Sequence, residues 1–171
     1  MDLRDSRPVD TEWGEFILHT FLDLVDDTVH YALTLGEMQA DRDTLVRVQA
    51  VNTLRDVLCT RIDDAGLGWS YRRCMAKIAE EGHGAMVLIG QSATAEQRLA
   101  EVLHYPAPLS VTGQSGASTA EEPQNYRAVG TGSQILKRLG IGRMRLMSAP
   151  IHFNALSGFD LTVTDFVQPD D

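Results

Sequence analysis

Apolar and polar residues alternate along the first third of the chain. Alternation with a period of two predicts strands over residues 15–25, 28–35 and 45–51. Asp26 and Asp27 separate the first two segments and predict the turn of a hairpin. Residues 1–12 are polar and acidic, and we interpret them as a linker or arm ahead of a domain over residues 13–168.

The pattern changes to a helical period over residues 69–81. Apolar side chains recur there at i, i+3, i+4 and i+7, namely Tyr71, Cys74, Met75 and Ile78. Gly82 is a helix stop, and the apolar run 85–89 predicts a buried strand. This segment therefore predicts a helix that packs on a sheet and leads into an inner strand.

Three weaker segments follow the same reasoning. Residues 52–62 are ambiguous and suit a short helix, whereas 94–104 predict a helix with Thr94 as N-cap and Gln97 at the capping-box position. Residues 106–124 are rich in Pro, Ser, Gly, Thr and Ala. Their composition is typical of a mobile surface loop, and the alternative is an active-site lid.

The stretch 125–163 repeats the helix-to-strand layout. After Gly130 and Gly132 it predicts a short amphipathic helix, which carries Ile135, Leu136 and Leu139 on one face and ends at Gly140. Strands over 144–147 and 159–166 follow. Three N-terminal strands, two helix–strand units and a closing strand indicate a single α/β domain with a mixed sheet.

Charge and cysteine content narrow the function classes. The 171 residues carry a formal net charge of −9, which argues against nucleic acid or an anionic membrane as partner. No apolar run approaches the ~20 residues that span a bilayer. The two cysteines, Cys59 and Cys74, are too few for a disulfide framework, and the polar N-terminus is unlike a signal peptide. A cytoplasmic protein is expected.

The segment that begins NYRAVGTGSQILKRLGIGRMRLMS at Asn125 resembles the C-terminal part of the GTP cyclohydrolase II family. The resemblance extends upstream through IAEEGHG at 78–84 and TEWGEF at 11–16, and so covers nearly the whole chain in order. It implies the fold of that family, a single mixed-sheet α/β domain. It also implies the family's activity in riboflavin synthesis, the opening of the imidazole ring of GTP with release of formate and pyrophosphate.

The resemblance implies a zinc site whose ligands are replaced here. The family holds zinc with three cysteines, and the matching positions are Asn52, Ala65 and Leu67. None of these can replace a thiolate, and the chain has no C-x-C sequence. No metal or other cofactor is therefore expected. A second interpretation is a rebuilt site that uses Cys59, which lies close to this segment in sequence.

The substrate residues of the family are matched only in part. Residues 90–94 read GQSAT where the family carries arginines for phosphates and a glutamate for guanine. The vestigial catalytic candidates are Arg127, its neighbour Asn125 in place of an aspartate, and Tyr105; the nucleotide-binding candidates are Arg47 and Ser148. The alternative for Tyr105 and Arg127 is structural, an aromatic cap on the core and an arginine paired with a loop carboxylate.

Two functions follow from these matches. The first is a cyclohydrolase-like domain that has lost catalysis and acts as a structural, dimerising or regulatory module. Such domains occur fused behind 3,4-dihydroxy-2-butanone 4-phosphate synthase, and the resemblance implies that arrangement, a homodimer, and weak binding of GTP or phosphate. The second is a working GTP cyclohydrolase II.

Overall fold

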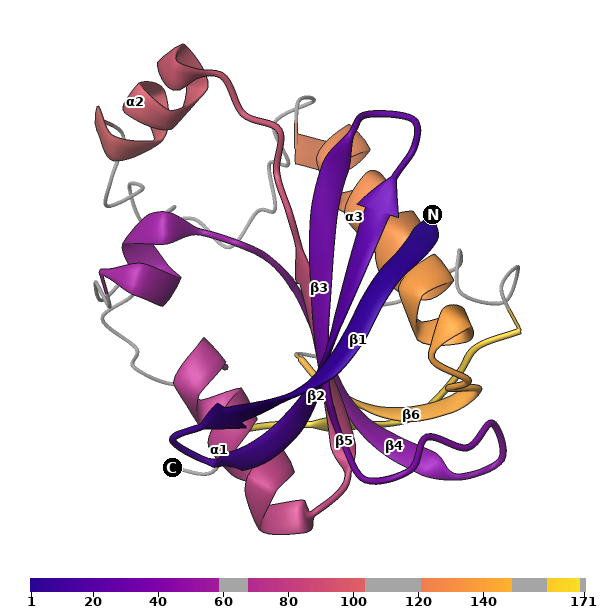
Figure 1. Cartoon of the computed structure of the whole chain (residues 1–171). Coiled ribbons are helices and arrows are strands. Elements are labelled where there is room, and N and C mark those ends of the chain that lie inside the picture. Colours follow the sequence, from indigo (N-terminus) through magenta and orange to yellow (C-terminus); the bar gives the residue numbers. More distant parts are fainter. Residues whose placement is uncertain (59–67, 104–120, 149–159, 170–171) are drawn as a thin grey trace.

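Seven strands hydrogen-bond into one mixed sheet, with helices on both of its faces (Figure 1). The computed structural model describes residues 1–58, 68–103, 121–148 and 160–169. The elements follow in the order β1 (Asp2–Thr11), β2 (Gly14–Asp23), β3 (Thr28–Leu35), β4 (Asp43–Ala50), the π-helical turn η1 (Thr53–Val57), α1 (Tyr71–Glu81), β5 (Gly84–Ile89), α2 (Ala95–Leu103), α3 (Glu121–Arg138), β6 (Arg143–Met147) and β7 (Thr162–Val167).

The strand order β1-β2-β3-β5-β4-β6-β7 divides the sheet into two halves. β1, β2 and β3 form an antiparallel meander, and β3 pairs with β5 in the antiparallel sense. β5, β4, β6 and β7 run parallel to one another. The expected mixed-sheet α/β architecture is thus confirmed, including the strands predicted over residues 15–25, 28–35, 45–51 and 85–89.

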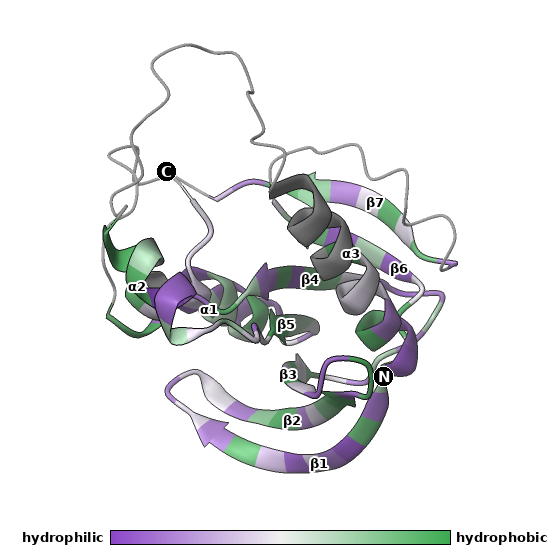
Figure 2. Cartoon of the chain, turned by 90° about the horizontal axis from the view of Figure 1, so that it is seen from above, coloured by the Kyte–Doolittle hydropathy of each residue, from purple (hydrophilic) through white to green (hydrophobic). Residues whose placement is uncertain are grey.

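The first strand differs from the sequence interpretation. Residues 1–12 were expected to be a linker or arm, but Asp2–Thr11 pairs with β2 over its whole length. β1 is mostly polar, with Leu3 and Val9 among charged and hydroxyl side chains (Figure 2), and Pro8 fits an edge position because it lacks a backbone donor. The many charged residues gave β1 no strand pattern in the sequence. They suit an edge strand, because charges at an edge discourage pairing with another chain.

The two faces of the sheet carry separate apolar cores. One face packs on α1, through Phe16, Leu33, Leu45, Cys74, Met75, Ile78, Met86 and Met147. The other packs on α3, through Phe21, Ala32, Val46, Ala85, Val87, Ile89, Ile135, Leu136, Ile141, Met144, Leu146 and Leu161. Figure 1 shows α1 and α3 on opposite sides of the strands. The parallel strands are therefore covered on both faces, as parallel sheets generally are.

α1 confirms the helix predicted over residues 69–81, with both ends explained by local chemistry. The Ser70 side chain accepts a 3.2 Å hydrogen bond from the backbone N–H of Arg73, which caps the first turn. Gly82 has φ of 68°, and its N–H bonds to the carbonyls of Ile78 and Ala79. Cys74, Met75 and Ile78 are fully buried against the sheet.

α3 is longer than the sequence predicted. Gly130 and Gly132 were interpreted as the entry to a short helix, yet both lie inside the 18 residues of α3. A β-carbon at Gly132 would lie 2.8 Å from Cγ1 of Val48, so the glycine permits close packing of α3 on β4. The helix ends at Arg138, and the predicted stop Gly140 follows with φ of 79°.

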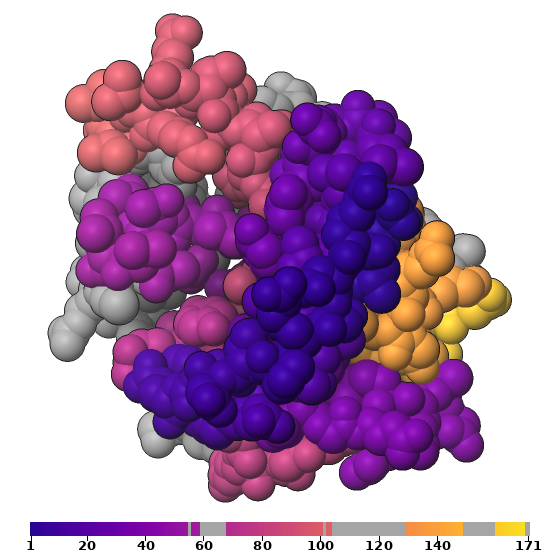
Figure 3. Space-filling model, in the orientation of Figure 1, coloured from indigo at the N-terminus to yellow at the C-terminus, as the bar shows by residue number. Residues whose placement is uncertain are grey.

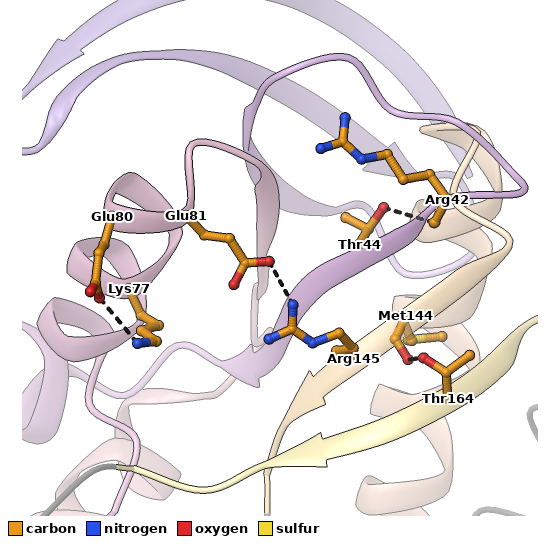
Figure 4. A network of polar contacts seen from close by, with 8 residues as sticks. All are labelled: Arg42, Thr44, Lys77, Glu80, Glu81, Met144, Arg145 and Thr164. Carbon is orange, nitrogen blue, oxygen red and sulfur yellow. Dashed lines mark hydrogen bonds and ion pairs between the residues drawn. The ribbon is translucent and has the colours of Figure 1, made fainter.

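Polar side chains connect β6, one of the parallel strands, to α1 and to β7 (Figure 4). Arg145 on β6 forms an ion pair of 2.7 Å with Glu81 in the last turn of α1. A register shift between Met144 and Arg145 interrupts the pairing with β7, and the Thr164 hydroxyl donates to the Met144 carbonyl at 3.1 Å. These contacts fix how β6 and β7 join the sheet.

The remaining helices also have local causes. The expected capping box of α2 is confirmed, because the N–H of Thr94 bonds to the side chain of Gln97 at 2.8 Å and the N–H of Gln97 to Thr94 at 3.2 Å. The ambiguous segment after β4 forms η1, a single π-helical turn. Within the described ranges, none of the helices combines the length and apolarity that crossing a bilayer requires.

Candidate functional site

The carboxyl ends of the four parallel strands meet at one edge of the sheet. Ligands of open α/β sheets bind outside this edge, because loops and helix starts gather there. β4 and β5 remain joined beyond their last residues, where the N–H of Val51 donates to the carbonyl of Ile89 at 2.9 Å. η1 follows β4 and α1 begins nearby, since the indole N–H of Trp69 donates to the Val167 carbonyl at the end of β7.

Arg47 and Ser148, the two nucleotide-binding candidates, are brought together at this edge. The half-buried Arg47 donates from Nη1 to the carbonyl oxygen of Met147 at 2.6 Å, one residue before Ser148. Its Nε donates to Oε1 of Gln49 at 3.4 Å. Ser148 in turn accepts through its carbonyl from the side chain of Gln168 at 3.1 Å. The guanidinium is thus engaged in joining β4 to β6.

Asp56 organises the turn after β4, and the sequence interpretation missed it. Its carboxylate accepts from Nε2 of Gln49 at 3.2 Å and from the backbone N–H of Asn52 at 2.9 Å. The N–H of Asp56 donates back to the Asn52 carbonyl at 2.8 Å. The available signal was the spacing of four residues between Asn52 and Asp56 directly after a strand.

An aromatic cluster lies beside this turn at the start of α1. The rings of Trp13 and Tyr71 meet edge to face, with centroids 5.8 Å apart. The Arg72 guanidinium lies 5.5 Å from the Trp13 ring centroid and pairs with Glu12 at 2.6 Å. Burial raises the pKa of the Tyr71 hydroxyl, and the carboxylates of Glu12 and Asp56 raise it further. Tyr71 therefore stays a neutral donor at physiological pH.

The sheet presents a surface beyond the N-terminal end of α1, which we call the shelf. One row of residues crosses it in register: Thr20, Tyr31, Leu88 and Gln49. Tyr31 is 39% exposed, whereas Gln49 is buried under its contacts with Arg47 and Asp56. Figure 3 shows the surface hollowed between η1 and the β2–β3 hairpin, below α2. The shelf is thus an apolar and aromatic surface with a polar boundary.

The vestigial catalytic candidates are not assembled by the described residues. Tyr105 lies outside them. Asn125 and Arg127 belong to the backbone of α3, but their side chains lie outside the described part of the chain. Their roles stay predictions.

The zinc implied by the resemblance finds no matching donor set among the residues that the structure describes. Asn52 stands at the position of one thiolate, and its N–H donates to the Asp56 carboxylate, while its carbonyl accepts from the Asp56 N–H. Ala65, Leu67 and Cys59 lie outside the described residues, and Cys74 is buried in the core on α1. In the part of the chain that the structure describes, no three His, Cys, Asp or Glu side chains are grouped to hold a metal ion.

Comparisons with known proteins agree with the fold. A model of the GTP cyclohydrolase II family matches residues 3–168. A 3,4-dihydroxy-2-butanone 4-phosphate synthase of Pseudomonas aeruginosa is 42% identical over 167 residues, which are 95% of this chain and 42% of that protein. The monofunctional riboflavin biosynthesis protein RIBA 2 of Arabidopsis thaliana is 30% identical over 158 residues, 92% of this chain and 32% of that protein.

A solved structure has a similar fold. The crystal structure of RibBX, a two-domain 3,4-dihydroxy-2-butanone 4-phosphate synthase from A. baumannii, superposes with a TM-score of 0.65 at 29% identity. The match covers 97% of this chain and 40% of that one. The chain thus spans about two fifths of the synthases that it matches.

Proposed function

Because the chain belongs to the GTP cyclohydrolase II family, we propose that it is a cyclohydrolase-like module without catalytic activity, which supports a 3,4-dihydroxy-2-butanone 4-phosphate synthase in riboflavin biosynthesis. The observation that carries the proposal is the turn at Asn52. The ring-opening reaction requires a water made nucleophilic at neutral pH, which a thiolate-bound zinc supplies. Here a carboxylate, Asp56, closes the turn through hydrogen bonds, with an amide residue at the position of the thiolate.

The substrate loop supports the same proposal. Where the family carries arginines and a glutamate, Gly90 packs against the meander and Thr94 leads into a helix. The N–H of Gly90 donates to Nδ1 of His30 at 3.0 Å, and Thr94 caps α2. A loop with these residues supplies neither a bidentate phosphate clamp nor a carboxylate for the guanine edge.

The association with a synthase rests on the relatives. The matched part is 42% of the Pseudomonas protein and 40% of the two-domain A. baumannii protein, and both are named as synthases. We propose that the module lies in the same polypeptide as a synthase domain, which precedes it in the chain. We also propose that the candidates Arg47, Ser148 and Arg127 bind GTP or phosphate weakly, and that this binding serves regulation.

The test measures metal and product in parallel. Purified chain is incubated with GTP, magnesium and added zinc, and formate, the pyrimidine product and bound zinc are quantified. We expect no stoichiometric zinc and no turnover. The matched control is the triple variant Asn52→Cys, Ala65→Cys and Leu67→Cys, which restores the three thiolates and should gain zinc. One tightly bound zinc in the unmodified chain, or turnover near ~1 s⁻¹, would establish the alternative, a working GTP cyclohydrolase II.

A further inference from the structure

Exposed apolar side chains gather at one end of the molecule. The described residues include eleven large apolar side chains that are exposed, and two of them, Leu3 and Ile17, lie along the meander. The other nine come from three segments at the carboxyl edge of the parallel strands: Leu24, Val25, Val29, Tyr31, Val57, Leu58, Leu99, Val102 and Leu103. We call these nine residues the apolar end. Single exposed apolar residues are ordinary, whereas a contiguous group marks an interaction surface.

α2 shows the feature most clearly. Leu99, Val102 and Leu103 stand at i, i+3 and i+4, so they form one stripe along the helix. They are 64%, 53% and 80% exposed. Helices of globular proteins normally turn such a stripe toward a core. Figure 1 shows α2 set apart from the strands of the sheet.

The three segments are also close in space. Figure 3 shows α2 above η1, with the β2–β3 hairpin across the hollow from both. Val29 and Tyr31 belong to β3 in the hairpin, and Val57 and Leu58 belong to η1 and the residue after it. A partner that fills this hollow would bury all three segments at once.

The charge around the apolar end indicates the chemistry of its partner. Residues 22–31, 53–58 and 95–103 contain six acidic residues and two arginines, a net charge of −4. The acidic ones are Asp23, Asp26, Asp27, Asp56, Glu96 and Glu101. A second copy of the chain would bring two acidic rims together, which is unfavourable. A protein surface with an apolar centre and a basic rim fits instead.

We propose that the apolar end is the surface on which this module docks against the synthase part of a two-domain chain. The inference rests on the proposed association with a synthase. About three fifths of each matched synthase lies outside the part that this chain matches, so a second folded unit is tethered beside the module in those proteins. Tethering raises the effective concentration of the two units, so an interface of modest size suffices.

The test compares hydrogen exchange in two molecules. One is this chain alone, and the other is the Pseudomonas aeruginosa synthase in which the matched segment is replaced by this chain. Nine helical residues with an uncovered stripe are marginally stable, so α2 amides should exchange fast in the chain alone. In the chimera we expect them to slow by on the order of tenfold or more, while α1 amides keep the same rate. Synthase turnover of the chimera reports that its other part is folded.

Substitutions identify the surface. Leu99→Asp together with Leu103→Asp should restore fast exchange of α2 in the chimera. Leu3→Asp, an equally simple change at an exposed residue away from the apolar end, should leave the slow exchange intact. Equal α2 rates in the chain and the chimera would overturn the proposal. So would slowing that appears in the chain alone as its concentration rises, because the occupant would then be a second copy. Neither readout depends on whether the chain opens GTP.

Discussion

The guanidinium of Arg47 donates a 2.6 Å hydrogen bond to the carbonyl oxygen of Met147, a residue 100 positions later in the chain. The ladder between β4 and β6 ends with the pair Val46 and Leu146, so the arginine continues the connection where backbone pairing stops. A side chain that was a candidate for binding a nucleotide thus also holds two parallel strands together at the carboxyl edge.

The first prediction removes this connection. Arg47→Met keeps the length and apolar stem of the side chain but leaves the Met147 carbonyl without this donor. We expect a loss of about 1.5–3 kcal/mol in the free energy of unfolding, measured by urea denaturation. Arg143→Met is the control, because Arg143 pairs with Asp43 on the surface and such pairs contribute about 0–1 kcal/mol. Equal losses for the two variants would contradict a special role for Arg47.

The second prediction concerns α1. Met75 is fully buried between α1 and the sheet, so Met75→Asp places an unpaired carboxylate in the core. The cost is on the order of 3–5 kcal/mol, which should abolish the folded state or lower the melting temperature strongly. Leu99→Asp on the exposed stripe of α2 should leave the melting temperature nearly unchanged. A soluble Met75→Asp protein that melts like the parent would remove this helix from the core.

Two glycines of α3 provide the third prediction. Gly130 has open space around it, so Gly130→Ala should stabilise the helix by about 0.5–1 kcal/mol. At Gly132 the new methyl group would meet Val48, whose branched side chain has little rotamer freedom, so the same substitution should be neutral or destabilising. Midpoints of chemical denaturation that shift equally in both variants would show that α3 does not rest on β4 at Gly132.

These glycines also show what the sequence could not reveal. The helices with a clear apolar period, and the alternating strands, were predicted because local pattern decides them. Gly130 and Gly132 signalled an irregular entry, since propensity alone does not show that a glycine faces a strand. β1 was missed because an edge strand needs no apolar face to be stable once β2 lies beside it.

The candidate site divides in the same way. Arg47 and Ser148 were identified from residue matches, and their proximity was not visible because 100 residues separate the strands that carry them. Asp56 was missed for the opposite reason. Its contacts with Gln49 and Asn52 are local, but an aspartate four residues after an asparagine is too common a pattern to indicate a structural role.

The fourth prediction is a pH dependence centred on His19. Hydrogen bonds of 2.8 and 3.0 Å join its ring nitrogens to the hydroxyls of Ser6 and Thr34, and burial lowers its pKa below the usual 6.5. The unfolded chain therefore takes up this proton at a higher pH than the folded chain. The contribution of the neutral His19 ring to the free energy of unfolding is present in full above pH ~6.5. It is lost as the pH falls through the pKa of His19 in the folded chain.

Replacement of the ring isolates that contribution. The free energy of unfolding of the parent should fall more steeply between pH 7 and 5 than that of His19→Gln, when both are measured by urea denaturation. The difference between the two curves cancels the titration of the other histidines. Parallel curves would show that His19 titrates alike in the folded and unfolded chains.

The fifth prediction is a homodimer. The resemblance to the family implies one, and twofold pairs are the commonest assemblies. Light scattering at micromolar concentration should give about twice the mass of one chain, which is 18.8 kDa. The Leu99→Asp and Leu103→Asp variant should still dimerise, because the acidic apolar end is unsuited to meeting its own copy. A mass of one chain at all concentrations would count against the dimer.

The position of β5 in the sheet imposes an order of events during synthesis and folding. β3 and β4 follow each other in the chain but are not neighbours, since β5 lies between them and joins both. The pairs β1–β2 and β2–β3 can form once Leu35 is made, whereas one edge of β3 and one edge of β4 stay open until residues 84–89 are inserted. The other edge of β4 stays open until β6 is made. Open strand edges template wrong pairing between chains. The interval between the synthesis of β4 and the closing of β5 is thus the period in which a nascent chain of this fold most needs protection from its neighbours.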